Sequence, residues 1–145
     1  MKTRKHIYDL DSTAYTGMIA LEKYLHNSQL QPLHIEFIKI RASQLNGCGY
    51  CLDLHNQDAL KKGADVRKLL VIAAWKETEL FSTEERLILQ LTEEITFIHK
   101  QGVTDETYSK GQEIFGELYF AQLMMCAVTI NAWNRIGIAT HKKAE

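Results

Sequence analysis

Apolar residues recur along this chain at the three- and four-residue spacing of amphipathic helices, and the alternation typical of strands is nearly absent. Helix start and stop signals agree with this pattern: Pro32 suits a first turn, Gly47 ends a helix, and Ser82 with Glu85 forms a potential capping box. The predicted helices cover about 15–25, 32–46, 48–62, 65–74, 82–98, a segment from Thr104 or Asp105, and 118–139. We therefore expect an all-α fold of about six to seven helices.

No feature of the chain marks a domain boundary. Pro32 is the only proline, and Gly/Ser-rich linkers, repeats and low-complexity tracts are missing. The 46% of hydrophobic and 24% of charged residues are ordinary for a globular protein, and 145 residues suffice for a stable core without a disulfide or metal. We expect residues 1–145 to form a single domain. The formal net charge of −1 gives no reason to expect nucleic acid or an anionic membrane as a partner.

The expected location follows from two segments. The basic N-terminus has no apolar stretch behind it, so it does not resemble a secretory signal. The most apolar run, Leu118–Ile130, is too short to cross a bilayer and predicts a buried helix. A cytoplasmic protein is therefore expected. In that reducing compartment a close cysteine pair is more often catalytic or metal-binding than structural.

The segment Cys48-Gly49-Tyr50-Cys51 carries the strongest chemical signal. On a helix starting at Cys48, that cysteine, Cys51 and His55 fall within about 60° of one face. Cysteines at this spacing can close a disulfide, and a helix N-terminus favours the reactive thiolate. His55 could act as the base. The cysteine at the helix start, flanked by two glycines, is expected to be the more accessible sulfur.

Two other interpretations of the segment stay open. Zinc could bind Cys48, Cys51 and His55, with Glu36 or another histidine as fourth ligand. However, no second pair of closely spaced ligands exists, as structural zinc sites usually have. The cysteines could also be small core residues. The sequence favours redox chemistry over both.

Glu36 is ambiguous when it is taken alone. A lone glutamate in a helix is most often a solvated surface residue. Glu36 is flanked by the apolar Ile35 and Phe37, and in an apolar environment its pKa would be raised and its carboxyl group could pass protons.

Three segments together resemble one known family. They are the run Glu36-Phe37-Ile38-Lys39-Ile40-Arg41-Ala42-Ser43 with Asn46, Cys48, Cys51 and His55; Glu84-Glu85-Arg86-Leu87; and Ile130-Asn131-Ala132-Trp133-Asn134-Arg135. They resemble the AhpD-like alkylhydroperoxidase branch of the carboxymuconolactone decarboxylase family, over roughly residues 14–140. The family motif is a glutamate, a CxxC twelve positions later, and a histidine four beyond the second cysteine.

The resemblance implies an all-α fold, assembly into homo-trimers or hexamers, and reduction of hydroperoxides without a cofactor. By position, Cys51 would attack the peroxide, Cys48 would resolve the product, and His55 with Glu36 would relay protons. A lipoyl-type or thioredoxin-type dithiol would be the reductant. Tyr50 stands where the best-studied hydroperoxidases have a histidine, a departure that bears on efficient peroxidase activity. Members of the wider family with decarboxylase or lactone chemistry typically lack the CxxC, so its presence argues against that chemistry here. The alternative function is a non-enzymatic zinc or small-ligand binding module on the same helical fold.

Several further residues have simpler interpretations. Cys126 is expected to be a small core residue. The histidines outside the motif (His6, His26, His34, His99 and His141) are expected at the surface, with His34 left open because it is close to Glu36 in sequence. Trp133 and Arg135 are expected to serve packing or a subunit contact, and Asn131 and Asn134 to bond a neighbouring helix end. The nearly all-round apolar first half of the last helix predicts a homo-oligomer.

Overall fold

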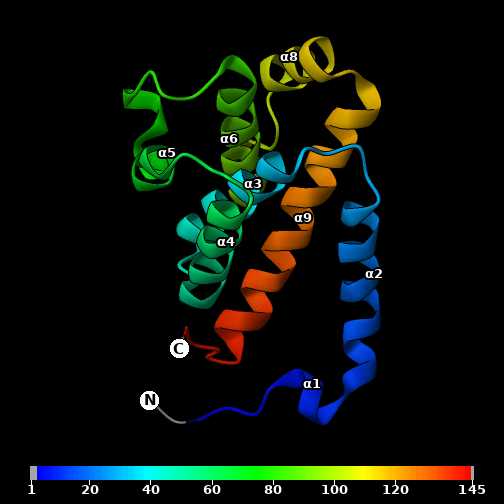
Figure 1. Cartoon of the computed structure of the whole chain (residues 1–145). Helices are drawn as coiled ribbons and strands as arrows, with labels where there is room; N and C mark the ends of the chain where they lie inside the picture. The colour runs from blue at the N-terminus through cyan, green and yellow to red at the C-terminus, as the bar shows by residue number, and fades with distance from the viewer. Residues whose placement is uncertain (1–2, 145) are drawn as a thin grey trace.

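All regular structure in residues 3–144, the range that the computed structural model describes, is helical (Figure 1). The α-helices are α1 (Ile7–Leu10), α2 (Tyr15–His26), α3 (Pro32–Asn46), α4 (Gly49–Lys61), α5 (Val66–Val71), α6 (Thr83–Thr96), α7 (Ile98–Gln101), α8 (Asp105–Phe115) and α9 (Glu117–Ala139). Two 3-10 helices, η1 (Ser12–Ala14) and η2 (Ile72–Glu77), complete the described range. The all-α prediction is confirmed. The extra helices α1 and α7 have four residues each, too few for a periodic pattern to be recognised.

The predicted start signals for two helices are confirmed. Ser82 and Glu85 form the reciprocal capping box of α6, and the Thr104 side chain caps α8. The helix expected from Asp65 to Ala74 is wrong in its second half. The chain passes into η2 after Val71, and Ala74 leaves the helical region. The three-residue repeat of a 3-10 helix brings Ile72 and Trp75 together into the core.

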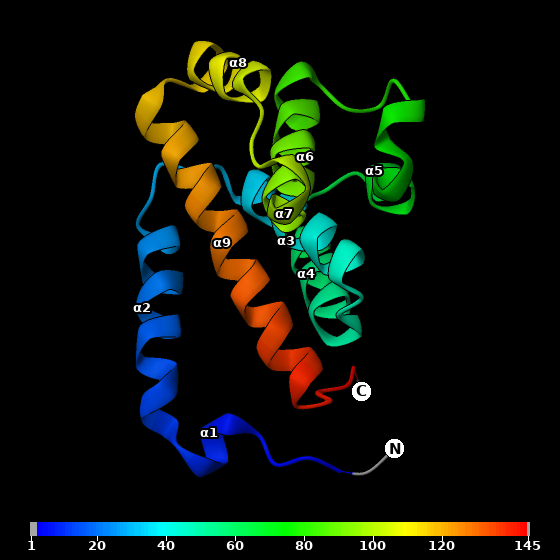
Figure 2. The ribbon, with the colours of Figure 1, turned by 180° about the vertical axis from the view of Figure 1, so that it is seen from behind.

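Helix α3 is the central element of the fold. It packs against α4, α6 and α9. The rear view in Figure 2 shows α3 in the middle of the molecule, among these helices. Its side chains enter two separate hydrophobic clusters, with Ile38 in one and Phe37 and Ile40 in the other. Because α3 is apolar on opposite faces, it connects both clusters and holds the elements around it in place.

The corner between α3 and α4 positions the cysteines. Gly47 ends α3 with φ 72°, a left-handed conformation that glycine adopts at little cost. The Cys48 N–H then donates to the Ser43 carbonyl at 3.0 Å, so the chain reverses within a few residues. Helix α4 begins at once with Cys48 as its N-cap. The turn therefore fixes where the first sulfur lies relative to α3.

Helix α2 stands apart from the centre and packs mainly along α9 (Figure 1). The segment before α1 returns to the far end of α9, where the Arg4 guanidinium donates to the Ala139 carbonyl at 2.7 Å. Within residues 3–144, no helix combines the length and the apolar character that a membrane crossing requires.

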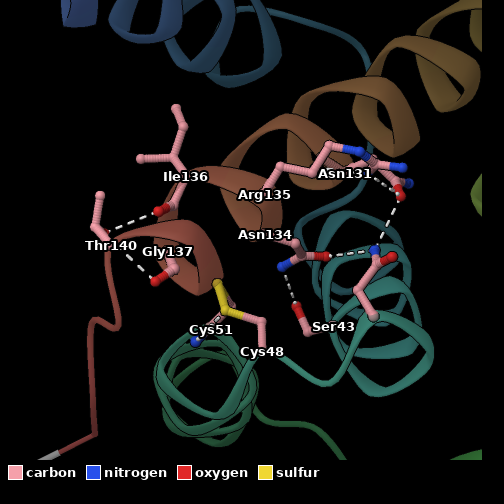
Figure 3. The surroundings of a disulfide bond; sticks show 10 residues. Ser43, Cys48, Cys51, Asn131, Asn134, Arg135, Ile136, Gly137 and Thr140 are labelled. Atoms are coloured by element: carbon pink, nitrogen blue, oxygen red, sulfur yellow. Dashed lines mark hydrogen bonds between the residues drawn. A yellow bond between two sulfur atoms is a disulfide. The ribbon is translucent and has the colours of Figure 1, made fainter. Parts of the chain in front are cut away.

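Asparagine side chains tie the end of α3 to α9. Asn46 donates to the Oδ1 atoms of Asn131 and Asn134, at 2.9 and 3.0 Å, and Asn134 donates to the Ser43 hydroxyl at 3.0 Å (Figure 3). The expectation that Asn131 and Asn134 bond a neighbouring helix end is confirmed. Arg135 completes the arrangement by donating to both oxygens of Asn131.

Replacing the buried Asn134 by alanine should destabilise the protein by about 2–3 kcal/mol, because the buried Ser43 hydroxyl and the half-buried Asn46 amide on α3 would each lose a hydrogen bond. Urea unfolding would measure the change. Asn27→Ala, at an exposed position after α2, is the matched control and should change stability by no more than about 0.5 kcal/mol. Equal effects of the two substitutions would contradict a structural role for the asparagine cluster.

Candidate functional site

Cys48 and Cys51 are joined by a disulfide at the first turn of α4. The Cys51 N–H points at the Cys48 sulfur, with 3.4 Å between the two heavy atoms. Figure 3 shows the sulfur pair facing Gly137 on α9. A Cβ atom at position 137 would lie 3.4 Å from the Cys48 sulfur and 3.7 Å from that of Cys51. A longer side chain there would have to displace the disulfide, so glycine allows α9 to approach it closely.

The expectation that Cys48 is the more accessible cysteine is wrong. Cys48 is 2% exposed and Cys51 is 5% exposed, so both are buried and Cys51 is slightly the more open. The prediction considered only the two flanking glycines, which lie next to Cys48 in sequence. In the folded chain Gly137 of α9 packs against the sulfurs. A long-range contact therefore overrides the local signal.

Glu36 and His55 form a buried hydrogen-bonded pair between α3 and α4. The distance between His55 Nδ1 and Glu36 Oε2 is 2.9 Å; His55 is 8% exposed and Glu36 is 2% exposed. The Lys62 ammonium, at the end of α4, pairs with the other carboxylate oxygen. Glu36 is thus not a surface residue. Its carboxylate is hydrogen-bonded to Nδ1 of His55, and the other ring nitrogen, Nε2, takes no part in this bond.

The expected rise in the pKa of Glu36 is also wrong. Burial disfavours the charged carboxylate, as predicted, but the hydrogen bonds and positive charges of His55 and Lys62 outweigh it and lower the pKa. The sequence showed the apolar neighbours Ile35 and Phe37. It did not show a lysine 26 positions away in the chain that reaches the carboxylate.

A cavity of about 390 Å³ opens beside the disulfide. Its wall is formed by Tyr15, Glu22, Lys39, Tyr50, Cys51, Leu54, His55, Asp58, Ile130, Trp133, Ile136, Gly137, Thr140 and Lys142. Cys51 and His55 both face this space, whereas Cys48 does not contribute to it. The α9 side of the wall is largely apolar, through Ile130, Trp133 and Ile136. A small molecule with an apolar part could therefore reach Cys51 next to the histidine.

The cavity wall contains an ion pair that was not predicted from the sequence. The Lys39 ammonium donates to both carboxylate oxygens of Glu22 at 2.9 Å, and the Trp133 indole N–H donates to the same carboxylate at 3.0 Å. Trp133 thus lines the cavity, a place that the expectation of packing or a subunit contact did not include. A lysine within the apolar run Phe37–Ile40 was the available signal, because a buried lysine needs a partner.

His34 and Cys126 lie away from this cavity. His34 is buried, contrary to the general expectation for histidines outside the motif, and its Nδ1 is 2.8 Å from the Tyr119 hydroxyl. Burial lowers the pKa of His34. Cys126 is a core residue as predicted, and burial raises the pKa of its thiol to about 12. That thiol is therefore unreactive.

The side chains of Glu36, His55 and Asp58 could hold a metal ion, since their ligand atoms lie within 4.8 Å of one another. Two features disfavour a cation there. Lys62 already supplies a positive charge to Glu36, and His55 uses Nδ1 for the same carboxylate. The four-ligand zinc site considered from the sequence also requires thiolates, and the two sulfurs are bonded to each other in this structure.

Comparison with known proteins identifies the class to which this fold and site belong. Residues 13–94 match the model of the carboxymuconolactone decarboxylase family. Over 144 residues the chain is 37% identical to the uncharacterized protein YdfG of Bacillus subtilis (strain 168), covering 99% of this chain and 98% of YdfG. The chain belongs to the carboxymuconolactone decarboxylase family. It is also 33% identical over 66 residues to the uncharacterized protein YnjA of Escherichia coli (strain K12), across 46% of this chain and 36% of YnjA.

Solved structures extend this likeness to three dimensions. A protein of unknown function from Agrobacterium tumefaciens, ATU0492, described as a candidate antioxidant defence protein AhpD, matches with a TM-score of 0.95 and 27% identity over 99% of both chains. An uncharacterized peroxidase-related protein from Silicibacter sp. TM1040 matches with a TM-score of 0.80 and 19% identity, over 92% of this chain and 71% of that protein. The first match confirms the AhpD-like fold, and the second shows a shared fold alone.

The lowered pKa of Glu36 predicts a specific pH dependence of stability. A carboxyl group whose folded-state pKa lies below its usual 4.5 stabilises the protein above that pH. The contribution is lost as the pH falls from 4.5 through the folded-state value. The free energy of unfolding of Glu36→Gln should therefore fall less between about pH 6 and pH 3 than that of the wild type. Urea unfolding at both pH values measures this, with the exposed-site variant Glu79→Gln as control; parallel curves for Glu36→Gln and wild type would contradict it.

Proposed function

We propose that this protein is a thiol-dependent peroxidase that reduces hydroperoxides through Cys51 and Cys48 within a single AhpD-like domain. The observation that best supports the proposal is the shared wall of the cavity. Cys51 and His55 border the same space, one helical turn apart, and the Glu36 carboxylate lies 2.9 Å from Nδ1 of the imidazole. This is the arrangement of a nucleophile, its base and the group that orients the base.

The first step begins from the reduced cysteine pair. His55 takes the Cys51 proton, and the resulting imidazolium is stabilised by the Glu36 carboxylate. The Cys51 thiolate attacks one peroxide oxygen, the O–O bond breaks, and the leaving alkoxide takes the proton back to become an alcohol. Cys51 is then a sulfenic acid.

The second step regenerates the disulfide. The Cys48 thiol attacks the Cys51 sulfur, an S–S bond forms, and the hydroxyl group leaves with the proton of Cys48 as water. The two thiols have supplied the two electrons that reduce the peroxide. The structure holds this oxidised product, and a dithiol donor of lipoyl or thioredoxin type would return it to two thiols by exchange.

Substituting each cysteine separately should distinguish their roles. Cys48→Ser should accumulate a sulfenic acid on Cys51 after a stoichiometric peroxide pulse, because the resolving thiol is missing. A dimedone-type probe and mass spectrometry would detect it. Cys51→Ser should neither label nor consume peroxide. Cys126→Ala should behave as wild type, because the Cys126 thiol is buried and has a raised pKa.

Two other results would contradict this assignment. Oxygen found first on Cys48 would reverse the two roles and keep the redox chemistry. Variants that show no oxidised sulfur, but lose bound zinc and stability together, would favour the metal-binding alternative. Protein purified without chelator, reduced, and analysed for metal separates that alternative from the peroxidase.

We further propose that the protein is a homo-oligomer, a trimer or hexamer as in the family it resembles. The supporting surface is narrower than the sequence suggested, because Phe120 and Leu123 are buried in the core of their own subunit. A stripe along one side of α9 remains at least partly exposed: Leu118, Ala121, Met125, Val128 and Ala132. Leu118 is 58% exposed and Val128 is 46% exposed. Stripes of this kind often cover one another between subunits.

Light scattering should therefore give a mass of three or six times the 16.7 kDa of one chain. Val128→Glu, in the middle of the stripe, should reduce that mass toward 16.7 kDa, because a charge would be buried at the interface. Leu70→Glu is the matched control, since Leu70 is a 77% exposed leucine on α5, away from the stripe. A 16.7 kDa wild type, or equal effects of both substitutions, would refute the proposed interface.

A further inference from the structure

The disulfide has openings on two sides, and the second differs in chemistry from the cavity at Cys51. An opening of about 300 Å³ is bordered by Cys48, and its other lining residues come from the corner between α3 and α4, the start of α4, the last turn of α9 and the segment after α9. It adjoins a larger groove of about 610 Å³, with which it shares Tyr50, His141, Lys142, Lys143 and Ala144. The N-terminal segment, with Arg4 and His6, forms the other side of that groove.

Positive charge is concentrated at the Cys48 opening and the adjoining groove. Arg4, Lys142 and Lys143 carry positive charges. Among the described residues that line either opening, Asp53 is the single carboxylate. The whole chain has a formal net charge of −1. The overall balance therefore conceals a basic surface that the sequence analysis did not anticipate.

A purely structural explanation accounts for only part of this surface. Cations are favourable at the C-terminal end of a helix, and Arg4 fills that role by donating to the Ala139 carbonyl. Lys143 has no ion pair with a described residue, and Lys142 lies over the Tyr50 ring, with its Nζ 3.9 Å from the ring centroid. The two lysines thus keep their positive charges available to a partner at the edge of the opening to Cys48.

We propose that the basic surface formed by Lys142 and Lys143 at the Cys48 opening, with Arg4 in the adjoining groove, docks an acidic polypeptide that carries the reducing dithiol. The proposal rests on the proposed function, because the peroxidase cycle needs a donor that returns the Cys48–Cys51 disulfide to two thiols. The positive surface would repel positively charged proteins and attract an acidic one, so it would both select the donor and speed its approach.

The exchange at this opening balances as follows. One donor thiolate attacks the Cys48 sulfur, the Cys48–Cys51 bond breaks, and Cys51 leaves as a thiolate that takes up a proton. The second donor thiol then attacks its own partner sulfur in the mixed disulfide. Cys48 leaves in turn as a thiolate and is protonated. The donor ends as a disulfide, and its two electrons restore both cysteines.

The two openings would thus divide the two substrates. The α9 side of the cavity at Cys51 is largely apolar and suits a hydroperoxide with an apolar part. Lys142 lies where the two openings meet, and Lys143 adds a second positive charge on the Cys48 side. Tyr50 and Lys142 border both openings. Donor and peroxide could therefore reach different sulfurs without competing for one entrance.

Reduction of the preformed disulfide by two synthetic peptides would test the docking surface. Each peptide carries one dihydrolipoyl-lysine, flanked by glutamates in one peptide and by glutamines in the other. Each rate is divided by that peptide's rate with hydroxyethyl disulfide, which removes differences in thiol reactivity. In the wild type at an ionic strength of about 0.01 M, the acidic peptide should be about tenfold faster. At about 1 M, where the Debye length is about 3 Å, the two rates should converge.

Charge variants locate the effect. Lys142→Glu/Lys143→Glu should abolish or invert the preference for the acidic peptide. Lys23→Glu/Lys100→Glu changes the net charge by the same amount at exposed sites on α2 and α7 that border neither opening, and it should keep the preference. Equal rates in the wild type at low ionic strength would overturn the docking surface. A preference unchanged in Lys142→Glu/Lys143→Glu would do the same.

Because the assay contains no peroxide, this result is independent of the peroxidase test. If both peptides reduce the disulfide equally fast and the protein still consumes peroxide, the proposed docking surface is wrong and the proposed function stands. A protein that keeps the acidic preference but never consumes peroxide retains the docking surface and loses the peroxidase.

Discussion

The buried carboxylate of Glu36 imposes the strongest constraint on this structure. An ionised group that is 2% exposed is stable only if the fold supplies compensating charge or hydrogen bonds. His55 and Lys62, both from α4 or its end, supply them. Helix α4 must therefore lie against α3 with a fixed rotation and a fixed shift along its axis. The same rotation directs Cys51, one turn before His55, into the cavity.

The corner at Gly47 makes this placement possible. Gly47 reverses the chain so that α4 starts immediately, and the asparagine cluster holds the end of α3 against α9. The α9 backbone at Gly137 then approaches the sulfurs closely enough to bury them. Each contact limits the freedom of the next, so the position of the disulfide between two openings is a property of three helices rather than of the CxxC segment alone.

Local signals in the sequence predicted much of the fold. Periodicity and capping residues located α3, α4, α6, α8 and α9 to within a few residues, because a helix is specified by residues close to one another in the chain. Helical geometry also placed Cys48, Cys51 and His55 on one face of one helix. Glu36 required the family resemblance, since its partner His55 lies on another helix, 19 positions away.

The errors share a single physical origin. The pKa of Glu36 depends on Lys62, and the burial of Cys48 depends on Gly137 of α9. The ion pair of Lys39 with Glu22 joins α3 to α2. Each of these contacts joins elements whose relative position is decided only by packing. A single sequence shows the candidate groups but not their distances, so charges and exposure at the site were the properties that it predicted least well.

Tyr50 is a position of the Cys48–Cys51 segment at which this chain departs from the pattern expected from the family resemblance. The family resemblance draws attention to Tyr50 because a histidine occupies its place in the best-studied hydroperoxidases. In this protein the ring holds Lys142 at 3.9 Å and borders both openings to the disulfide. The face of an aromatic ring attracts a cation, so Tyr50 gives Lys142 a fixed place beside the disulfide. In the proposed mechanism proton transfer rests on His55 and Glu36, whereas the contribution of Tyr50 is to the walls of the two openings and to the position of Lys142.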